Sequence, residues 1–338
     1  MSPAAAGPPL TRLVFDDLPG WRDDSLADFW PAFLASVSAI AGQTPSLRVA
    51  MPADNALLKV ASKALDARPE DARAFVEAHF APWRIGAGGF VTAYYEPMVA
   101  GSRVRSDKFA APILARPRDL DNVSPYPDRR AIRTGAITGQ TAPVVWLRDA
   151  VEVFLIQVQG SARVTLGDGT QLRLVYDGRN GRPYTSIGRI LVARGAITPD
   201  AMSLAVLKAW LRDNGAGVGG FADEIMDANQ SYVFFRAEPV IDPAQGPTGG
   251  QGLPLTAFRS IAIDRTVWPY GLPFWVRADL PAGPFRRLMV AQDTGSAIVG
   301  PARADLFFGS GDAAGDAAGL VRHAADLFVL LPAGKDGG

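Results

Sequence analysis

The sequence predicts a mainly β protein with N-terminal helices, a β-rich α+β fold built as two lobes. A chain of 338 residues with 48% hydrophobic content exceeds the usual size of one domain, so we expect two cores. Apolar residues follow a helical period in the first part of the chain. From Gly89 onward, short β-branched and aromatic runs alternate with turn residues, a pattern typical of small barrels.

Three helices are expected before Gly89. The first has its apolar residues on one face over 26–40, and Gly42 is placed to end it. Asp54 is a candidate cap for a second helix over 56–67. Pro69 stands at a favourable first-turn position for a third helix over 70–80.

Short strands and two helices account for the rest of the chain. Gly167-Asp168-Gly169 is a hairpin signal between two β-type runs. Apolar alternation predicts a strand over 151–158, and helical spacing returns over 186–215 with Thr198-Pro199 opening the second helix. The expected strands cover 90–97, 111–114, 143–147, 151–158, 162–166, 171–176, 232–235, 260–263, 274–276, 288–291 and 327–331.

The composition excludes several classes of function. Lys plus Arg and Asp plus Glu number 34 each, so no excess positive charge attracts nucleic acid. Cysteine is absent, which removes disulfides, thiolate nucleophiles and Cys-bound zinc. With only His79 and His323, in unrelated contexts, a Ser-His-Asp triad or a multi-His metal site is not expected.

The hydropathy pattern predicts no transmembrane segment. No apolar run reaches the ~18 to 20 residues that a membrane-spanning helix needs. The first residues, Met1 to Ala6, lack the basic and apolar regions of an export signal, although a signal could already have been removed. We therefore interpret the chain as a soluble form or a trimmed one.

Two carboxylates, Asp293 and Asp305, stand twelve positions apart in strongly apolar surroundings. A charge in such a run is costly unless it is hydrogen-bonded or functional, so the pair suggests acid/base chemistry. Asp293-Thr294-Gly295 also matches the signature of pepsin-like proteases, which need two such loops, and only one is present. Spacing alone favours a turn or helix-cap role for either aspartate.

A longer series of motifs resembles one bacterial family. Residues 288–311 resemble the C-terminal signature of the MltA-type lytic transglycosylases, which cut the glycan strands of peptidoglycan. Residues 92–97 are similar to the family's Thr-Gly-Tyr-Tyr-Glu-Pro motif, with Ala93 in place of glycine. Further blocks follow in the family's order at 157–162, 176–189, 229–235, 252–256 and 260–264.

The resemblance implies a fold and a reaction. The fold is a double-psi β-barrel domain over 1–96 and 236–333, with a smaller β-barrel and a helical segment inserted at 97–235 and a groove between them. In the reaction, one aspartate acts as acid and then as base. It corresponds to Asp305, and Asp293 is the supporting carboxylate. The substrate's own C6 hydroxyl attacks C1 and leaves a 1,6-anhydromuramoyl end, so the family implies no metal and no cofactor.

Cleavage of a glycosidic bond requires a carboxyl group with a raised pKa, and the surroundings of Asp305 favour one. Protonating a glycosidic oxygen needs a carboxylic acid whose pKa lies near neutrality. The apolar residues 306–308 and a second carboxylate at Asp293 would both raise the pKa of Asp305. An intramolecular hydroxyl has a high effective concentration, so no protein nucleophile is required.

Polar and amphipathic side chains in the matched motifs are candidates for binding the glycan, although each also suits a core position. Gln and Ser suit sugar hydroxyls and amides, and Tyr suits the ring faces. These candidates are Thr92, Tyr95, Glu96, Gln159, Ser161, Tyr184 and Tyr232. The predicted partner is the peptidoglycan strand, bound by a monomer in the periplasm, in association with the outer membrane or cell wall. The alternatives are a non-catalytic peptidoglycan-binding barrel module and an Asp-Thr-Gly protease.

Overall fold

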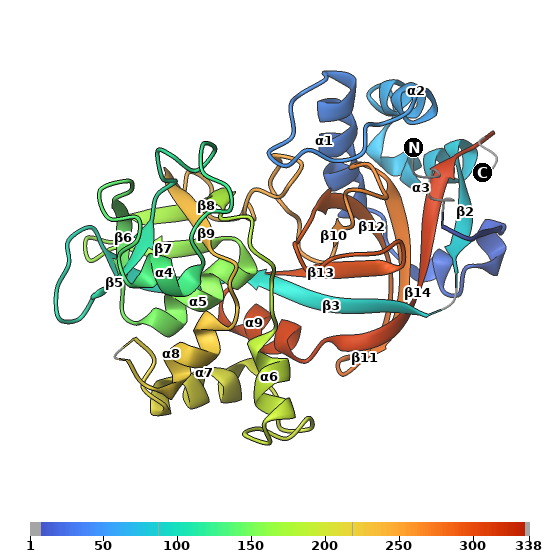
Figure 1. Cartoon of the computed structure of the whole chain (residues 1–338). Helices are drawn as coiled ribbons and strands as arrows, with labels where there is room; N and C mark the ends of the chain where they lie inside the picture. Colours follow the sequence, from blue (N-terminus) through green and yellow to red (C-terminus); the bar gives the residue numbers. More distant parts are fainter. Residues whose placement is uncertain (1–7, 87, 218, 335–338) are drawn as a thin grey trace, which may run out of the picture. The chain divides into compact units, whose positions relative to one another are not determined.

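The computed structural model describes residues 8–86, 88–217 and 219–334, in two compact units (Figure 1). Unit 1 holds the described residues up to Tyr94, then Thr248–Gly309 and those from Leu320 onward. Unit 2 holds Tyr95–Pro247 and Ser310–Gly319. The sequence-based domain limits, 1–96 with 236–333 and 97–235, stay a prediction. The N-terminal segment that lacks an export signal pattern lies outside the described residues.

Unit 1 is built on a closed six-stranded barrel. Its strands hydrogen-bond in the order β14-β11-β12-β10-β13-β3, and β3 pairs with β14 to close the ring, while β2 and then β1 extend from β14. The strands are β1 (Leu10–Arg12), β2 (Phe80–Ile85), β3 (Gly89–Glu96), β10 (Ser260–Ile263), β11 (Pro273–Leu280), β12 (Gly283–Asp293), β13 (Arg303–Ser310) and β14 (Arg322–Pro332). The predicted β-rich barrel fold is confirmed.

Three helices cover part of this barrel, as predicted. They are α1 (Phe29–Ala41), α2 (Asn55–Ala64) and α3 (Ala72–His79), and α1 contacts β12 while α2 contacts β14. The side chain of Asp54 accepts the N–H of Leu57 at 2.8 Å, so the predicted cap is confirmed. Gly42 ends α1, also as predicted.

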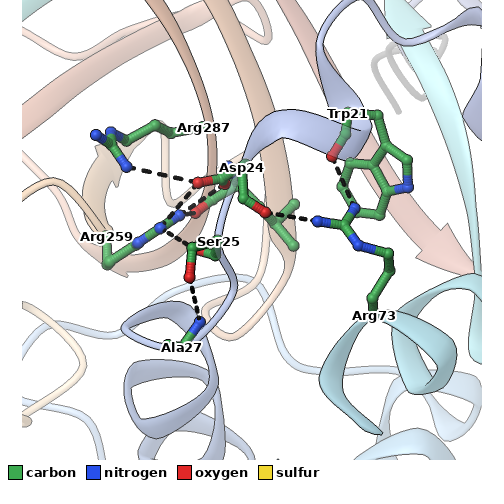
Figure 2. A network of polar contacts seen from close by, with 8 residues as sticks. Trp21, Asp24, Ser25, Ala27, Arg73, Arg259 and Arg287 are labelled. Carbon is green, nitrogen blue, oxygen red and sulfur yellow. Dashed lines mark hydrogen bonds and ion pairs between the residues drawn. The ribbon is translucent and has the colours of Figure 1, made fainter. Parts of the chain in front are cut away.

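A buried ion pair ties the N-terminal segment to the barrel (Figure 2). The guanidinium of Arg259 donates to both carboxylate oxygens of Asp24, at 2.8 and 2.9 Å, and the N–H of Leu288 also donates to Asp24 at 2.8 Å. Arg73 donates to the backbone oxygens of Trp21 and Asp24, at 2.7 and 2.5 Å. This segment therefore satisfies its buried polar groups through residues that lie far away in the sequence.

Unit 2 contains a six-stranded sheet and six helices in the described residues. The strand order is β5-β6-β4-β7-β8-β9, and β7 and β8 form the predicted hairpin. The strands are β4 (Met98–Ser102), β5 (Ala111–Leu114), β6 (Pro143–Leu147), β7 (Ala162–Thr165), β8 (Gln171–Arg179) and β9 (Val233–Pro239). The helices are α4 (Arg129–Arg133), α5 (Ala150–Gln159), α6 (Ile187–Ala193), α7 (Leu204–Asp213), α8 (Phe221–Asp227) and α9 (Asp312–Gly319).

The strand expected over 151–158 is wrong, because this segment is the helix α5. Most of its residues are buried, so its apolar run is almost continuous. Such a run fits the period of a helix and that of a strand equally well, and it does not distinguish the two. The helix ends carry the decisive signals: Asp149 accepts the N–H of Glu152 at 2.9 Å, and Gly160 takes the left-handed conformation with φ 84°. Helix α7 likewise begins after Ser203 rather than at Thr198. In the part of the chain that the structure describes, no helix is long and apolar enough to cross a membrane.

Candidate functional site

The barrel of unit 1 brings together three of the predicted site residues. Asp305 lies on β13, opposite Ala262 of β10, and Asp293 is the last residue of β12, which pairs with the other edge of β10. Thr92 lies on β3, the neighbour of β13 in the barrel. Strands β12, β13 and β3 supply one side chain each, with β10 between β12 and β13, which explains how positions so far apart in sequence share one site.

A short relay of hydrogen bonds fixes the orientation of Asp305. The Thr92 hydroxyl donates to Oδ1 of Asp305, and Nη2 of Arg303 donates to the Thr92 oxygen at 2.6 Å. Because Thr92 Oγ1 accepts from Arg303, its own proton is directed to Asp305. No described residue donates to Oδ2 of Asp305, so this oxygen is the one free to carry or receive a proton.

Asp293 is held by neutral donors from different segments. The phenol of Tyr94 donates to Oδ2 at 2.7 Å, and the backbone N–H of Gly250 donates to Oδ1 at 2.7 Å. A Cβ on Gly250 would stand 2.5 Å from the Tyr270 hydroxyl and 3.3 Å from Oδ1 of Asp293, so glycine permits this close approach. The Tyr270 hydroxyl is buried and has no hydrogen-bond partner among the described residues.

Burial sets the protonation behaviour of both aspartates. The pKa of Asp305 rises to about 6, mainly because of burial; the Thr92 hydrogen bond and the Arg303 charge oppose this rise, and the charge of Asp293 adds to it. Burial likewise raises the pKa of Asp293, against the hydrogen bonds from Tyr94 and the backbone. Both residues are half-buried rather than fully buried, so the pair combines a desolvated setting with some access for a reactant.

Tyr94 and Arg303 are absent from the candidates of the sequence analysis. Tyr94 stands two positions after Thr92 on β3, and successive alternate residues of a strand share a face. That alternation was the available signal for Tyr94. Arg303 and Gly250 gave no comparable signal, because the contact of each depends on the closed barrel.

The other predicted residues belong to unit 2. Glu96 is fully buried: Arg163 donates to Oε2 at 3.0 Å, Arg173 to Oε1 at 2.8 Å, and the Ser310 hydroxyl to Oε2 at 2.7 Å. All these contacts lie within unit 2 and join Glu96 to β7, β8 and Ser310. The arrangement favours a structural role for Glu96.

The remaining five candidates differ in exposure. Oε1 of Gln159 accepts the backbone N–H of Tyr95 at 3.2 Å, so these two are in contact. Ser161 and Tyr232 are buried, whereas Tyr184 is 37% exposed. Tyr232 contacts Arg129 and Phe234 within unit 2. Their proposed role in binding glycan stays a prediction.

Comparison with known proteins decides the family. Residues 90–236 match the family described as "MltA specific insert domain", and residues 259–331 match the "3D domain". A membrane-bound lytic murein transglycosylase structure from Agrobacterium tumefaciens is 37% identical, with a TM-score of 0.85 over 96% of this chain and 97% of that one. The chain belongs to the MltA family of lytic murein transglycosylases. The resemblance found in its motifs is thereby confirmed.

Further MltA relatives extend this similarity. The MltA structure from Neisseria gonorrhoeae is 28% identical, with a TM-score of 0.79 over 98% of this chain and 95% of that one. Escherichia coli MltA with bound chitohexaose is 25% identical, with a TM-score of 0.71 over 97% of each chain. Membrane-bound lytic murein transglycosylase A of Vibrio cholerae is 32% identical over 71% of this chain. The match spans 64% of that curated relative.

Proposed function

We propose that this MltA-family chain is a lytic transglycosylase that cleaves the β-1,4 bond between MurNAc and GlcNAc of peptidoglycan without using water. The observation that carries the proposal is Asp305, a single carboxyl with a pKa of about 6, held in a defined orientation beside Asp293. At pH 7 a group with this pKa keeps its proton in roughly a tenth of the molecules. Both protonation states are therefore accessible to one residue near neutral pH, as an acid that later acts as base requires.

In the first step Asp305 acts as the acid. Thr92 holds Oδ1 as a hydrogen-bond acceptor, which leaves the proton to Oδ2. Oδ2 gives this proton to the glycosidic oxygen as the bond from that oxygen to C1 of MurNAc breaks. The electron pair of the bond leaves with the GlcNAc oxygen, which becomes a hydroxyl, and positive charge develops at C1.

In the second step the Asp305 carboxylate acts as the base. It removes the proton of the C6 hydroxyl of the same MurNAc residue, and the C6 oxygen forms a bond to C1. The product is a 1,6-anhydro ring, and Asp305 is protonated again, so no net proton is consumed. The attacking hydroxyl is part of the substrate, which explains why no second protein nucleophile is needed.

Asp293 supports this cycle electrostatically. Its negative charge opposes ionisation of Asp305 before the reaction and stabilises positive charge near C1 during it. The donors Tyr94 and Gly250 occupy one oxygen each, which fixes the carboxylate in place. The proposed setting is the periplasm, with a monomer acting on glycan strands.

Purified sacculi provide the test. We expect the wild-type chain to release muropeptides with anhydro ends, detected by mass spectrometry. The Asp305→Asn variant, which keeps an acceptor for Thr92, should lose release by ~10²- to 10⁴-fold while still sedimenting with sacculi. Sedimentation without release by the wild type would indicate a non-catalytic binding module. Pepstatin-sensitive peptide cleavage would indicate the protease alternative instead.

A further inference from the structure

Three arginines are buried in the described residues, and one of them differs from the other two. Arg163 and Arg259, which are 4% and 1% exposed, pair with Glu96 at 3.0 Å and with Asp24 at 2.8 Å. Arg129, on α4 in unit 2, is 5% exposed and has no carboxylate within ion-pair distance among the described residues. A buried cation is normally compensated by an anion, so Arg129 requires an explanation.

All the recorded hydrogen-bond acceptors of Arg129 are neutral. Its Nε donates to the backbone oxygen of Asn229 at 2.9 Å, Nη1 to Oε1 of Gln157 at 2.5 Å, and Nη2 to the backbone oxygen of Ser231 at 2.5 Å. A guanidinium carries five N–H groups, so Nη1 and Nη2 each keep one more. The group lies against aromatic rings, 4.6 Å from the centroid of Phe154 and 5.2 Å from that of Tyr232.

Arg129 also lines a cavity within unit 2. The cavity has a volume of about 390 Å³ and lies between α4, α5, α8 and β5. Its walls are mainly apolar and include Leu114, Ile132, Phe154 and Met226. A concave, mostly apolar space with few polar groups is typical of a small-molecule site.

The carboxylates near the cavity form their ion pairs with Arg133, and Asp227 acts on Arg129 only over a longer distance. Arg133 and Asp227 also line it, but Arg133 pairs with Asp227 at 2.7 Å and with Asp223 at 3.3 Å. Burial lowers the pKa of Arg129 to about 10, because the charged form is desolvated. An anion in the cavity would give Arg129 the direct ion pair that Arg163 and Arg259 already have.

We propose that this cavity binds a small monocarboxylate with an apolar body, whose carboxylate faces Arg129. Guanidinium groups favour carboxylates, and apolar walls favour a hydrocarbon part over a fully hydrated anion such as phosphate. Two sources supply this chemistry: a free acyl carboxylate, and the peptide stem of a muropeptide. The proposal does not involve Asp305 and goes beyond the transglycosylase reaction.

Isothermal titration of the full chain with matched probes tests the chemistry. Hexanoate should bind at least ~10-fold more tightly than its neutral isostere hexanamide, because a charged hydrogen bond is lost in the amide. Inorganic phosphate should bind more weakly than hexanoate. A disaccharide carrying its peptide stem, compared with the same disaccharide without the stem, distinguishes the two sources. Equal binding of hexanoate and hexanamide, or binding of neither, would overturn the proposal.

Two threonine variants place the binding in this cavity without disturbing Arg129. Thr138 is exposed and lines the cavity, whereas Thr134 is exposed and does not line it. Each hydroxyl donates to a nearby backbone oxygen, at 2.8 Å to Gly135 and at 2.9 Å to Arg130 respectively. Thr138→Trp should abolish hexanoate binding and Thr134→Trp should preserve it. Unchanged binding in Thr138→Trp would exclude the cavity.

A third variant tests the role of charge and is expected to strengthen binding instead of abolishing it. Asp227→Asn removes the carboxylate of the lining and leaves Arg133 less compensated. We expect hexanoate to bind severalfold more tightly to this variant, whereas hexanamide should be unaffected. Weaker hexanoate binding would contradict an electrostatic role for Arg129. Release of anhydro ends from sacculi, measured in parallel, should be unchanged in Thr138→Trp, so failure of this proposal is distinct from failure of the proposed activity.

Discussion

Two pairs of carboxylates in this chain, Asp24 with Glu96 and Asp293 with Asp305, are held in different ways. Asp24 in unit 1 and Glu96 in unit 2 are enclosed by guanidinium groups, which supply full positive charges. Asp293 and Asp305 receive hydrogen bonds from hydroxyl groups and backbone N–H groups. Arg303 contacts Thr92 rather than a carboxylate in this site.

This difference separates structural carboxylates from those suited to proton transfer. The guanidinium partners of Asp24 and Glu96 join these carboxylates to distant segments of the chain through charge-assisted hydrogen bonds. Neutral donors compensate burial only in part, and the pKa of Asp305 rises to about 6. We infer that burial, opposed by only one hydroxyl donor and the more distant charge of Arg303, allows Asp305 to exchange a proton near neutral pH.

The largest expected effect comes from breaking a structural pair. Asp24→Asn leaves Arg259 buried without a counter-charge, so the free energy of unfolding should fall by about 3 to 5 kcal/mol. Urea unfolding followed by tryptophan fluorescence measures this change. Asp305→Asn is the matched control, because the same chemical change there removes a carboxylate that forms no direct ion pair with a guanidinium of the described residues. Equal destabilisation by both changes would contradict the comparison.

The stability difference between Asp305→Asn and the wild type should change with pH in a defined direction. The pKa of Asp305 is about 6 in the folded chain and 3.8 as the reference value, so folding favours the protonated form. Its contribution to stability is present below pH 3.8 and is lost as the pH rises through 6. Asp305→Asn should therefore gain stability relative to the wild type between these limits and keep this gain at pH 8. Melting temperatures at pH 4, 6 and 8 measure the trend, and a pH-independent difference would argue against the raised pKa.

Two substitutions should shift the pH dependence of activity in opposite directions. Because the acid must be protonated, kcat/KM for sacculi should fall as the pH rises through about 6. Asp293→Asn removes a charge that raises the pKa of Asp305, so the fall should move to lower pH. Thr92→Val removes a hydrogen bond that lowers this pKa, so the fall should move to higher pH. Shifts of the same sign would mean that one of these contacts acts differently.

Local signals in the sequence predicted much of the fold and part of the site. The Asp54 cap and the hairpin turn at 167–169 depend on neighbouring residues alone, and both are present. The prediction of a strand over 151–158 is wrong because this helix is buried on most sides. It therefore lacks the polar face whose spacing would distinguish a helix from a strand. The sequence also could not predict the ion pairs of Glu96, since its partners Arg163 and Arg173 become its neighbours only through sheet pairing.

The smallest predicted effect concerns two tyrosines beside Asp293. Tyr94→Phe removes a 2.7 Å hydrogen bond and leaves Asp293 with one donor fewer, so it should destabilise the fold by about 1 to 3 kcal/mol. The Tyr270 hydroxyl is desolvated and has no partner among the described residues, so Tyr270→Phe should stabilise the fold by about 1 kcal/mol or less. Urea unfolding measures the free energy of unfolding of both variants, which each lose one tyrosine hydroxyl. If Tyr270→Phe is destabilising instead, its hydroxyl has a partner in solution, such as a water shared with Asp293, and belongs with the neutral donors of the aspartate pair.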